Sequence, residues 1–403
     1  MNLIFFDNNK RIDLLPFTFT RTMADIRIGI LTIREKWEKH FNCVSSSLTV
    51  NYLNTKFPIK IDYDNILILG NICPTKELLK TIEYLPINSV LKNGNSVIAA
   101  RLDKENTTIL LQNHRELNDS FELSFDFITN EEHFLSEIFE IKHVWDIFSK
   151  NGKAIEDDFE LLTRNRQSQP IPANNQFKNP EKIFIEEGAK IDFSILNADS
   201  GPIYIGKDAE VMDGSIIRGP FALCEHSSTK LATKIYGPTT VGPYSKVGGE
   251  LNNVVIFGYS NKGHDGFIGN AVIGEWCNLG ADTNCSNLKN NYAEVKIWSY
   301  KEQKMIPTGL TFCGLQMGDH SKCGINTMFN TGTVVGVGAN IYGGDFPPTF
   351  VPSFSWGGSA GFESYQFDKF IETAKRVYQR RNLELSKIDI DILEKIYDKS
   401  ALI

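Results

Sequence analysis

The chain lacks the features typical of metal-cluster, disulfide-rich, membrane and nucleic-acid-binding proteins. Its 7 cysteines among 403 residues lie scattered, without the paired spacing of a zinc site, so neither a metal cluster nor a disulfide framework is expected. No segment approaches the roughly 18 consecutive apolar residues of a membrane span, and the apolar residues 1–7 are too few for a secretory signal. With 42 basic against 49 acidic residues and no basic run, a broad nucleic-acid surface is excluded. We expect a cytoplasmic protein that binds neither membranes nor nucleic acid.

What the sequence does have is a repeat of six residues. Small aliphatic side chains recur at this interval, often with a glycine directly after them, at Ile205, Val211, Ile217 and Leu223; Ile235, Val241 and Val247; Phe267, Ile273 and Leu279; Met317 and Cys323; and Val335 and Ile341. Such a repeat is typical of a parallel β-helix, in which each short strand points one apolar side chain into a narrow prism and each corner admits only small residues. The alternative is a β-sandwich, but its turns recur about every 8–12 residues.

The periodicity divides the chain into four parts. Residues 1–163 alternate apolar runs with helical stretches, which predicts an α/β domain with strands at 3–6, 66–69, 96–100 and 108–111 and helices at 30–41, 75–85 and 131–139. Residues 164–182 are polar and contain prolines, as in a linker. The β-helix is predicted over 183–346. Residues 347–403 are predicted to be a C-terminal helical extension, with helical periodicity at 367–381 and 388–398.

One histidine stands inside the repeat, in the run Lys262-Gly263-His264-Asp265-Gly266-Phe267-Ile268-Gly269. A second run, Asn278-Leu279-Gly280-Ala281-Asp282-Thr283, follows it. These runs, in the order of an α/β head, a linker and a β-helix, resemble the bifunctional enzymes that acetylate glucosamine 1-phosphate and then uridylylate the product, and more closely their GlmU-like relatives in Bacteroidetes. The resemblance implies a nucleotidyltransferase-like α/β head followed by a left-handed parallel β-helix of hexapeptide repeats.

The chemistry of acetyl transfer explains why such a site needs His264. A sugar ammonium must lose a proton before it attacks the thioester of acetyl-CoA, and histidine is the side chain whose pKa suits that task. The resemblance implies further roles by position: Glu250 as the partner of the histidine, Asn278, Asn287 and Lys262 as substrate ligands, and the Ala281 amide as the group that stabilises the oxyanion formed from acetyl-CoA. It also implies a homotrimer. The alternative is a structural histidine at a corner of the prism.

Some of the family's phosphate ligands are missing. Glu225 and Asn252 stand where the family has an arginine and a lysine, and the loss of two cations removes the strongest contacts to a phosphate group. Cations elsewhere in the β-helix are candidates to replace them, namely Arg218, Lys230, Lys234, Lys262 and Lys289. The acceptor sugar therefore stays open.

The head departs further from the family's pattern. Nucleotidyltransferases begin with a strand and a glycine-rich loop whose amides cradle the triphosphate, but here the glycines are replaced, while two arginines and a Leu-Pro-Phe-Thr segment remain. The resemblance implies that the nucleotide is bound, with Mg²⁺, by Arg11, Thr18, Arg21 and Asn71. An asparagine is a weak substitute for the family's aspartate at a hard cation. In the alternative, residues of this cluster such as Asp25 and Arg27 merely pair across a turn.

Two classes of function compete. In the first, the protein is a sugar-nucleotide enzyme that transfers an acetyl group to an amino sugar or its phosphate in the β-helix, with a divergent head that takes a nucleoside triphosphate. In the second, both sites have decayed, and the trimer is a scaffold or a regulatory module that binds nucleotides or phosphosugars. The run around His264, beside Asn278, favours the first class.

Overall fold

The computed structural model describes residues 2–117 and 120–400, which fold into two compact units. The first unit, called the head here, contains Met1–Ile26 and Leu31–His143. The second, called the β-helix unit, contains Arg27–Ile30 and Val144–Ile403. Helices α4 (Asp146–Ser149) and α5 (Asn151–Thr163) therefore belong to the second unit, although they lie before residue 163, where we predict the boundary.

The head is built on a mixed β-sheet. Its strand order is β2-β1-β3-β6-β5-β9, in which β1 pairs in parallel with β2 and β3, whereas β6 is antiparallel to β3 and β5. The strands are β1 (Asn2–Phe6), β2 (Ser45–Leu48), β3 (Asp64–Leu69), β5 (Ser89–Asn93), β6 (Ser96–Asp103) and β9 (Asn130–His133), with the short pairs β4 (Ile72–Cys73) and β10 (Phe139–Glu140), and β7 (Arg115–Leu117) and β8 (Ser120–Glu122). The helices are α1 (Ile33–Phe41), α2 (Lys76–Glu83) and α3 (Lys104–Gln112), and 3₁₀ turns occur at η1 (Asn9–Leu14), η2 (Phe17–Phe19), η3 (Met23–Asp25) and η4 (Asn51–Leu53). This arrangement confirms the predicted α/β head.

Two predicted elements of the head are wrong. Residues 108–111 were expected to form a strand but lie in α3, because the Asp103 side chain accepts a hydrogen bond from the Asn106 amide and caps a helix there. Residues 131–139 were expected to form a helix, yet 130–133 form the edge strand β9. The main-chain hydrogen bonds that β9 makes with β5 outweigh the weak helical pattern of this exposed segment.

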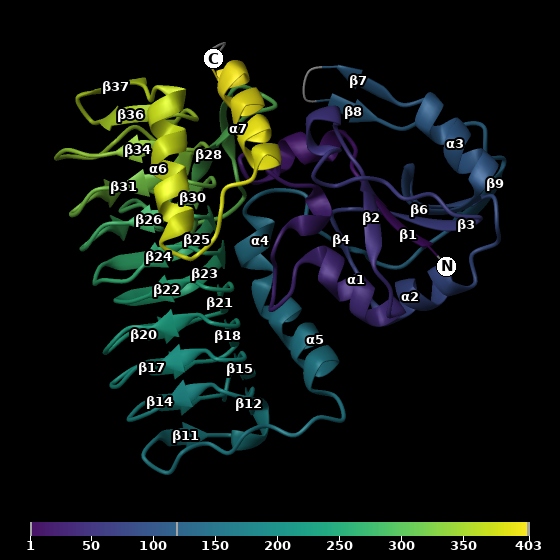
Figure 1. Cartoon of the computed structure of the whole chain (residues 1–403). Coiled ribbons are helices and arrows are strands. Elements are labelled where there is room, and N and C mark those ends of the chain that lie inside the picture. Colours follow the sequence, from purple (N-terminus) through teal and green to yellow (C-terminus); the bar gives the residue numbers. More distant parts are fainter. Residues whose placement is uncertain (1, 118–119, 401–403) are drawn as a thin grey trace. The chain divides into compact units, whose positions relative to one another are not determined.

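The β-helix unit is a stack of coils that form three parallel faces (Figure 1). The first face contains β11 (Gln176–Lys178), β14 (Ile195–Asn197), β17 (Ile216–Arg218), β20 (Lys234–Tyr236), β27 (Asn284–Cys285) and β32 (Met328–Phe329). The second contains β12 (Ile183–Ile185), β15 (Ile203–Ile205), β18 (Phe221–Leu223), β21 (Thr239–Val241), β30 (Gln316–Met317), β33 (Val334–Val335) and β35 (Phe350–Val351). The long strands β23 (Glu250–Gly258) and β25 (Phe267–Glu275) run through both faces.

The third face is a separate 10-stranded sheet. It contains β13 (Lys190–Ile191), β16 (Glu210–Val211), β19 (Ser228–Thr229), β22 (Lys246–Val247), β24 (Asn261–Lys262), β26 (Asn278–Leu279), β31 (Lys322–Cys323), β34 (Asn340–Ile341) and β36 (Ser355–Gly358), to which β37 (Gly361–Ser364) adds an antiparallel strand. A hairpin of β28 (Lys296–Ser299) and β29 (Lys304–Pro307) follows β27 in the chain. β11 begins the stack within the predicted linker, and β36 extends it past residue 346.

The six-residue repeat predicts the core of the prism correctly, with one shift of register. Val211, Val241 and Val247 are fully or almost fully buried, as are the other predicted inward residues apart from Phe267. The inward residue of that strand is Ile268, which pairs with Leu251, so Phe267 lies on the outer side. A shift of one residue turns every side chain of a strand to the opposite face, which explains the error.

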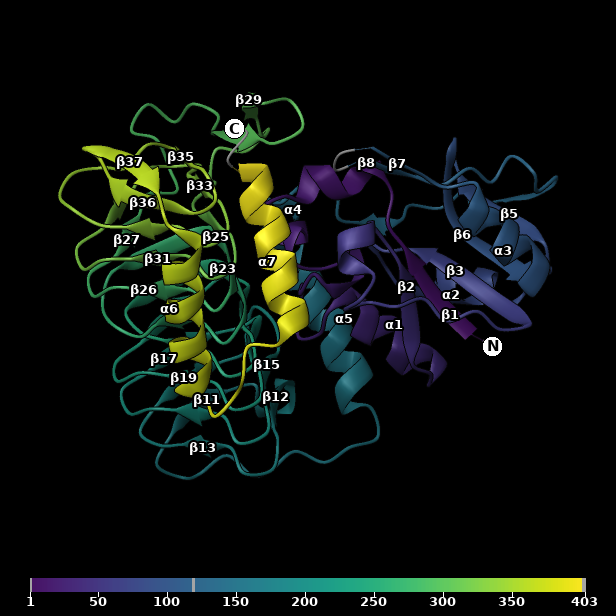
Figure 2. The same cartoon turned by 45° about the horizontal axis from the view of Figure 1, so that its top comes forward.

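Two C-terminal helices follow the last coils, as predicted. They are α6 (Phe367–Gln379) and α7 (Lys387–Ser400), and both lie beside the coils (Figure 2). Aromatic contacts fix α6, since Phe370 packs edge-on against His320 and Tyr378 stacks on Trp276 with 3.8 Å between ring centroids. The C-terminal end of α6 is thereby held over the third face.

Candidate functional site

His264 lies at the corner where the chain passes from the third face to the first, between β24 and β25. Its side chain is exposed, while Lys262, two residues earlier, points into the prism and is only 2% exposed. Lys262 Nζ donates hydrogen bonds to the main-chain oxygens of His264 and Asp265, at 2.6 and 2.9 Å. Desolvation lowers the pKa of the Lys262 ammonium to about 8. Lys262 therefore holds the His264 loop from inside, and its ammonium does not face a substrate as the resemblance implied.

A groove of about 660 Å³ runs across the third face beside this corner. One wall is the corner itself, with His264 and Ala281, and the other contains Tyr259 and Trp276. The floor and the rim supply mostly polar and basic side chains: Lys246, Asn261, Asn278 and Lys322 from the third face, Lys230 from a neighbouring coil, and Arg380 and Arg381 from the end of α6. The groove therefore brings together three of the predicted site residues, His264, Asn278 and Ala281.

The groove is electropositive. Desolvation and then the charges of Arg381, Lys230 and Arg380 lower the pKa of Lys246. Within residues 2–117 and 120–400, these four cations form no salt bridge, and Arg381 bonds only a neutral amide, Asn261 Oδ1, at 3.1 Å. Cations that crowd together without a protein carboxylate attract an anionic ligand. The sequence named Lys230 as a candidate. Lys246 of β22 was not named, and Arg380 and Arg381 were missed because the end of α6 is distant in sequence from the other groove residues.

A ladder of stacked rings holds the groove's other wall. His226, Tyr244, Tyr259 and Trp276 follow one another at the corner between the second and third faces, with centroid separations of 4.8, 4.9 and 4.3 Å. All four have positive φ, between 53° and 62°, a conformation that side chains other than glycine adopt at a cost. Ring stacking between successive coils and under Tyr378 offsets that cost.

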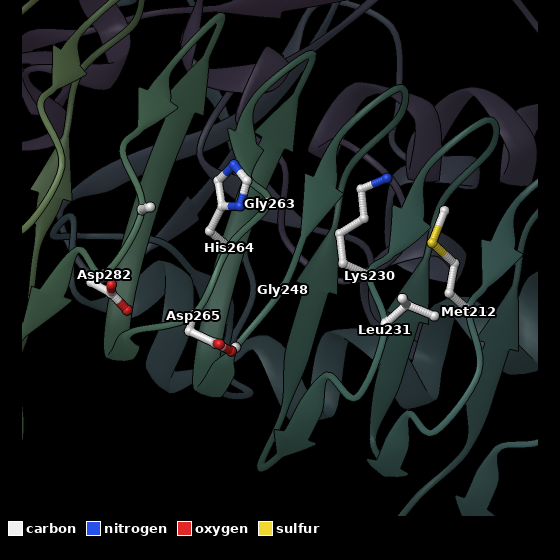
Figure 3. A pocket seen from close by; sticks show the side chains of 10 residues that line it. Met212, Lys230, Leu231, Gly248, Gly263, His264, Asp265 and Asp282 are labelled. Atoms are coloured by element: carbon white, nitrogen blue, oxygen red, sulfur yellow. The ribbon is translucent and has the colours of Figure 1, made fainter.

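A second hollow, of about 500 Å³, adjoins His264 on the side of the preceding coils. Figure 3 shows Lys230, Leu231 and Met212 on one side of it and His264 and Asp265 on the other, with Gly248 between them. His264, Gly263, Ala281 and Lys230 line both the hollow and the groove. The histidine thus stands at the junction of two cavities.

Two predicted residues lie outside this junction. Glu250 accepts a hydrogen bond from the Tyr236 hydroxyl, which raises the pKa of Tyr236 to about 12. Asn287 donates to Asn270 Oδ1 at 2.7 Å. In the part of the chain that the structure describes, neither is hydrogen-bonded to His264. Their implied roles, as partner of the histidine and as substrate ligand, stay predictions.

The cations predicted to bind a nucleotide are buried inside the head. Arg11 is 0% exposed, and its Nη2 donates to the Thr18 main-chain oxygen at 2.7 Å, while the Thr18 hydroxyl donates back to the Arg11 oxygen at 2.6 Å. Arg21 is 5% exposed and donates to the Phe17 oxygen at 3.1 Å. These side chains hold η1 and η2 together, so they do not reach a nucleotide unless the segment rearranges.

Asn71 is buried beside charged side chains, and its role as a ligand of Mg²⁺ stays a prediction. Its amide is buried and donates to Glu140 Oε1, and that carboxylate already pairs with Lys10 at 2.6 Å and with Lys142 at 3.8 Å. Across residues 2–117 and 120–400, no group of three or more His, Cys, Asp or Glu side chains is arranged to hold a metal ion. Arg27, which the alternative interpretation pairs with Asp25, donates to the Phe257 oxygen within the β-helix unit, and Asp25 pairs with Arg34.

Comparisons with known proteins match the two parts of the chain, with a family match that extends past the head into α4 and α5. Residues 3–167 match the family model described as sugar nucleotidyl transferase. A bifunctional sugar-1-phosphate nucleotidylyltransferase/acetyltransferase of Sulfurisphaera tokodaii is 30% identical over 146 residues, which cover 36% of this chain and 36% of that protein. The bifunctional protein GlmU of Methanocaldococcus jannaschii is 24% identical over 344 residues, covering 81% of this chain and 78% of the relative.

Solved structures show weaker overall likeness. The polySia-specific acetyltransferase NeuO matches 52% of this chain and 94% of its own, at 16% identity and a TM-score of 0.24. LpxA of Bacteroides fragilis, a UDP-N-acetylglucosamine acyltransferase, matches 57% and 91%, at 12% identity and the same TM-score. None of the helices within residues 2–117 and 120–400 has the length and apolarity that crossing a membrane requires.

Proposed function

We propose that the β-helix unit transfers the acetyl group of acetyl-CoA to the amino group of a sugar or sugar phosphate, with His264 as general base. The observation that carries the proposal is the groove, in which an exposed histidine shares a cavity with Asn278, Ala281 and a set of cations without carboxylate partners. The phosphates of acetyl-CoA are anions that suit those cations.

Two groups would supply the chemistry. His264 would accept the proton of the amine as the nitrogen attacks the thioester carbonyl. Ala281 lines the groove, and its main-chain N–H makes no hydrogen bond among the described residues, so this N–H would be available to an oxyanion. The side chain of Asn278, exposed on the groove floor, is a further polar group for the substrate.

The test is the change His264→Ala, assayed by release of the CoA thiol with a panel of amino sugars and their 1-phosphates. We expect the rate to fall about 10²- to 10⁴-fold, the usual effect of removing a general base, with binding of acetyl-CoA unchanged. His226→Ala is the matched control, because His226 is also an exposed corner histidine of the prism and stands in the aromatic ladder. An unchanged rate in His264→Ala would remove the histidine from the mechanism.

We propose further that the active protein is a homotrimer in the cytoplasm. Apolar side chains on the outer side of the first face support self-association: Ile195, Ile216 and Tyr236 are 40, 45 and 38% exposed, on adjacent strands. Light scattering decides the assembly, and a monomer at micromolar concentration would contradict it. Ile216→Lys should weaken the trimer, whereas Lys190→Glu on the third face should leave it intact.

For the head we propose at most a weak or altered sugar-1-phosphate nucleotidyltransferase activity. The match of residues 3–167 to a sugar nucleotidyl transferase model supports it, and the burial of Arg11 and Arg21 opposes a strong one. Pyrophosphate release from UTP, dTTP, CTP and GTP with a sugar 1-phosphate measures it directly. Turnover with none of these pairs would leave the head as a binding or structural domain.

A further inference from the structure

One corner of the prism is shorter than its neighbours. This corner joins the inward residue of the third face to the first strand residue of the first face. It contains four residues in the coils of Val211, Thr229, Lys262 and Leu279. In the coil of Val247, only Gly248 and Gly249 separate Val247 from Glu250. Two residues are therefore missing from the corner that directly precedes the His264 corner in the stack.

The short corner produces the hollow beside His264. The coil of Val247 lies between two coils with full-length corners, and its own corner lacks two residues. A gap therefore separates the corner of Lys230 and Leu231 from the corner of His264 and Asp265. This gap is the cavity of about 500 Å³ (Figure 3). Both glycines are needed for so tight a turn. A Cβ on Gly248 would lie 2.8 Å from the Gly263 oxygen, and Gly249 has φ +75° with a Cβ position 2.7 Å from the Gly266 oxygen.

The hollow and the groove differ in charge. The groove has Lys246, Arg380 and Arg381, none of which lines the hollow, whereas the hollow has Asp265 and Asp282, neither of which lines the groove. Both carboxylates are exposed and without a hydrogen-bond or ion-pair partner among the described residues, and Lys230, which is half-buried, borders both cavities. Carboxylates attract an ammonium group and repel a phosphate.

We infer that the hollow made by the short Gly248–Gly249 corner binds the acceptor, and that this acceptor is an amino sugar without a phosphate on the part that enters. The inference rests on the proposed acetyl transfer. Leu231 and Met212 offer apolar contact to one side of a sugar ring, and Asp265 and Asp282 draw its ammonium toward His264. The acyl donor occupies the groove on the other side of the histidine.

The reaction balances in this arrangement. The ammonium first releases one proton to solvent, and the freed nitrogen forms a bond to the acetyl carbon while His264 accepts a second proton from it. The carbon–sulfur bond of the thioester breaks, and the CoA thiolate leaves with the electron pair of that bond and takes the second proton from the histidine. The products are an amide, a free thiol and the proton released to solvent.

Filling the hollow tests the inference. Leu231 is 67% exposed, so Leu231→Trp should place an indole in the cavity and leave the core intact. With glucosamine as the probe, we expect its KM to rise at least about tenfold, while the KM of acetyl-CoA stays within about twofold. Phe193→Trp is the matched control, because Phe193 is 64% exposed at the same corner two coils away and does not line the hollow.

The charge of the acceptor gives a second measurement. Asp282→Asn should raise the KM of glucosamine and reduce the preference of the enzyme for glucosamine over glucosamine 1-phosphate. If the wild-type protein transfers acetyl groups but Leu231→Trp and Asp282→Asn leave the acceptor's KM unchanged, or the phosphorylated sugar is preferred, the hollow is not the acceptor site and the proposed acetyl transfer stands. If no amine in the panel is acetylated by the wild-type protein, the proposed function fails and this inference with it.

Discussion

Basic residues in the head and in the β-helix unit behave in opposite ways. In the head, the Arg34 guanidinium forms two bonds with Asp25, at 2.7 and 2.9 Å, and Arg11 lies 3.7 Å from Asp7. Burial opposes the charge of Asp25, but Arg34 lowers its pKa below the usual value. In the groove, Lys246, Arg380 and Arg381 stand together without a carboxylate.

The difference separates cations that support a fold from cations that await a ligand. A buried arginine whose donors already meet carboxylates and carbonyls has no capacity left for a phosphate. In the groove, desolvation and the charges of neighbouring cations lower the pKa of Lys246, and an anionic ligand would offset that repulsion. The following changes put this distinction to the test.

The largest effect is expected from Arg34→Ala in the head. The change leaves the Asp25 carboxylate without its partner and should cost about 3–5 kcal/mol in the free energy of unfolding of the head, measured by hydrogen exchange on head peptides. Arg101→Ala, which removes a half-exposed partner of Asp64, should cost less than about 1 kcal/mol. Arg380→Ala in the groove should change the stability hardly at all. Equal losses for all three would erase the distinction.

The next effect concerns the groove. The double change Lys246→Ala/Arg381→Ala should raise the Kd of acetyl-CoA about 100-fold, since each charge-assisted contact contributes at least about 1.5 kcal/mol and 1.4 kcal/mol corresponds to a factor of ten. Calorimetric titration measures it, and the salt dependence of binding should weaken in parallel. Lys190→Ala/Lys207→Ala removes the same charge from exposed positions on other coils and should leave Kd unchanged. A similar loss in that control would mean that net charge alone attracts the ligand.

A smaller effect is expected from Lys262, the buried cation under the His264 loop. Its pKa of about 8 in the folded protein lies below the ordinary lysine value of 10.5, so between these pH values the unfolded chain binds more protons and stability rises with pH. Lys262→Met should abolish that part of the rise. The measurement is the free energy of unfolding of wild type and variant from pH 7 to pH 10.5. As the pH rises, the wild type should become more stable relative to the variant. A constant difference would show that the lysine titrates normally.

The smallest effect is expected from a nucleotide. UTP with Mg²⁺ should leave the thermal stability of the head unchanged, because the candidate ligands Arg11, Thr18 and Arg21 are buried and bonded to protein. Acetyl-CoA at 100 times its Kd should add roughly 2.7 kcal/mol to the β-helix unit. If UTP stabilises the wild-type head and Arg21→Ala abolishes that effect, the nucleotide site predicted from the sequence is supported.

The architecture could be predicted from the sequence because each coil of the β-helix follows the same six-residue pattern. Each inward residue, such as Val211 or Val241, meets the same neighbours in the coils on either side, so periodicity alone locates it. The prediction failed at Phe267, where strands β23 and β25 run around a corner and the interval between inward residues falls from six to five. In the head, the strand at 108–111 was mispredicted because a cap at Asp103 overrides the preference of β-branched residues.

The site was only partly predictable. His264, Asn278 and Ala281 were found because they lie in one stretch of sequence, and the structure brings them to one groove. Arg380 and Arg381 reach the same groove only through the packing of α6, which no local pattern reports. The inward direction of Lys262 was also hidden, because a lysine at a core position contradicts the apolar rule by which the core was recognised.

The stack of rings that ends at Tyr378 makes Trp276 an optical reporter. Its indole is held between the phenol of Tyr259 and that of Tyr378, with interplanar angles of 12° and 19°, and it forms part of the groove wall. Detachment of α6 would uncover one face of the indole and move its emission to longer wavelength. Entry of a ligand beneath the end of α6 would instead alter the emission intensity without a large shift. The chain has 5 tryptophans, so in a variant that retains only Trp276 the fluorescence would distinguish an undocked helix from an occupied groove, in real time and without any added label.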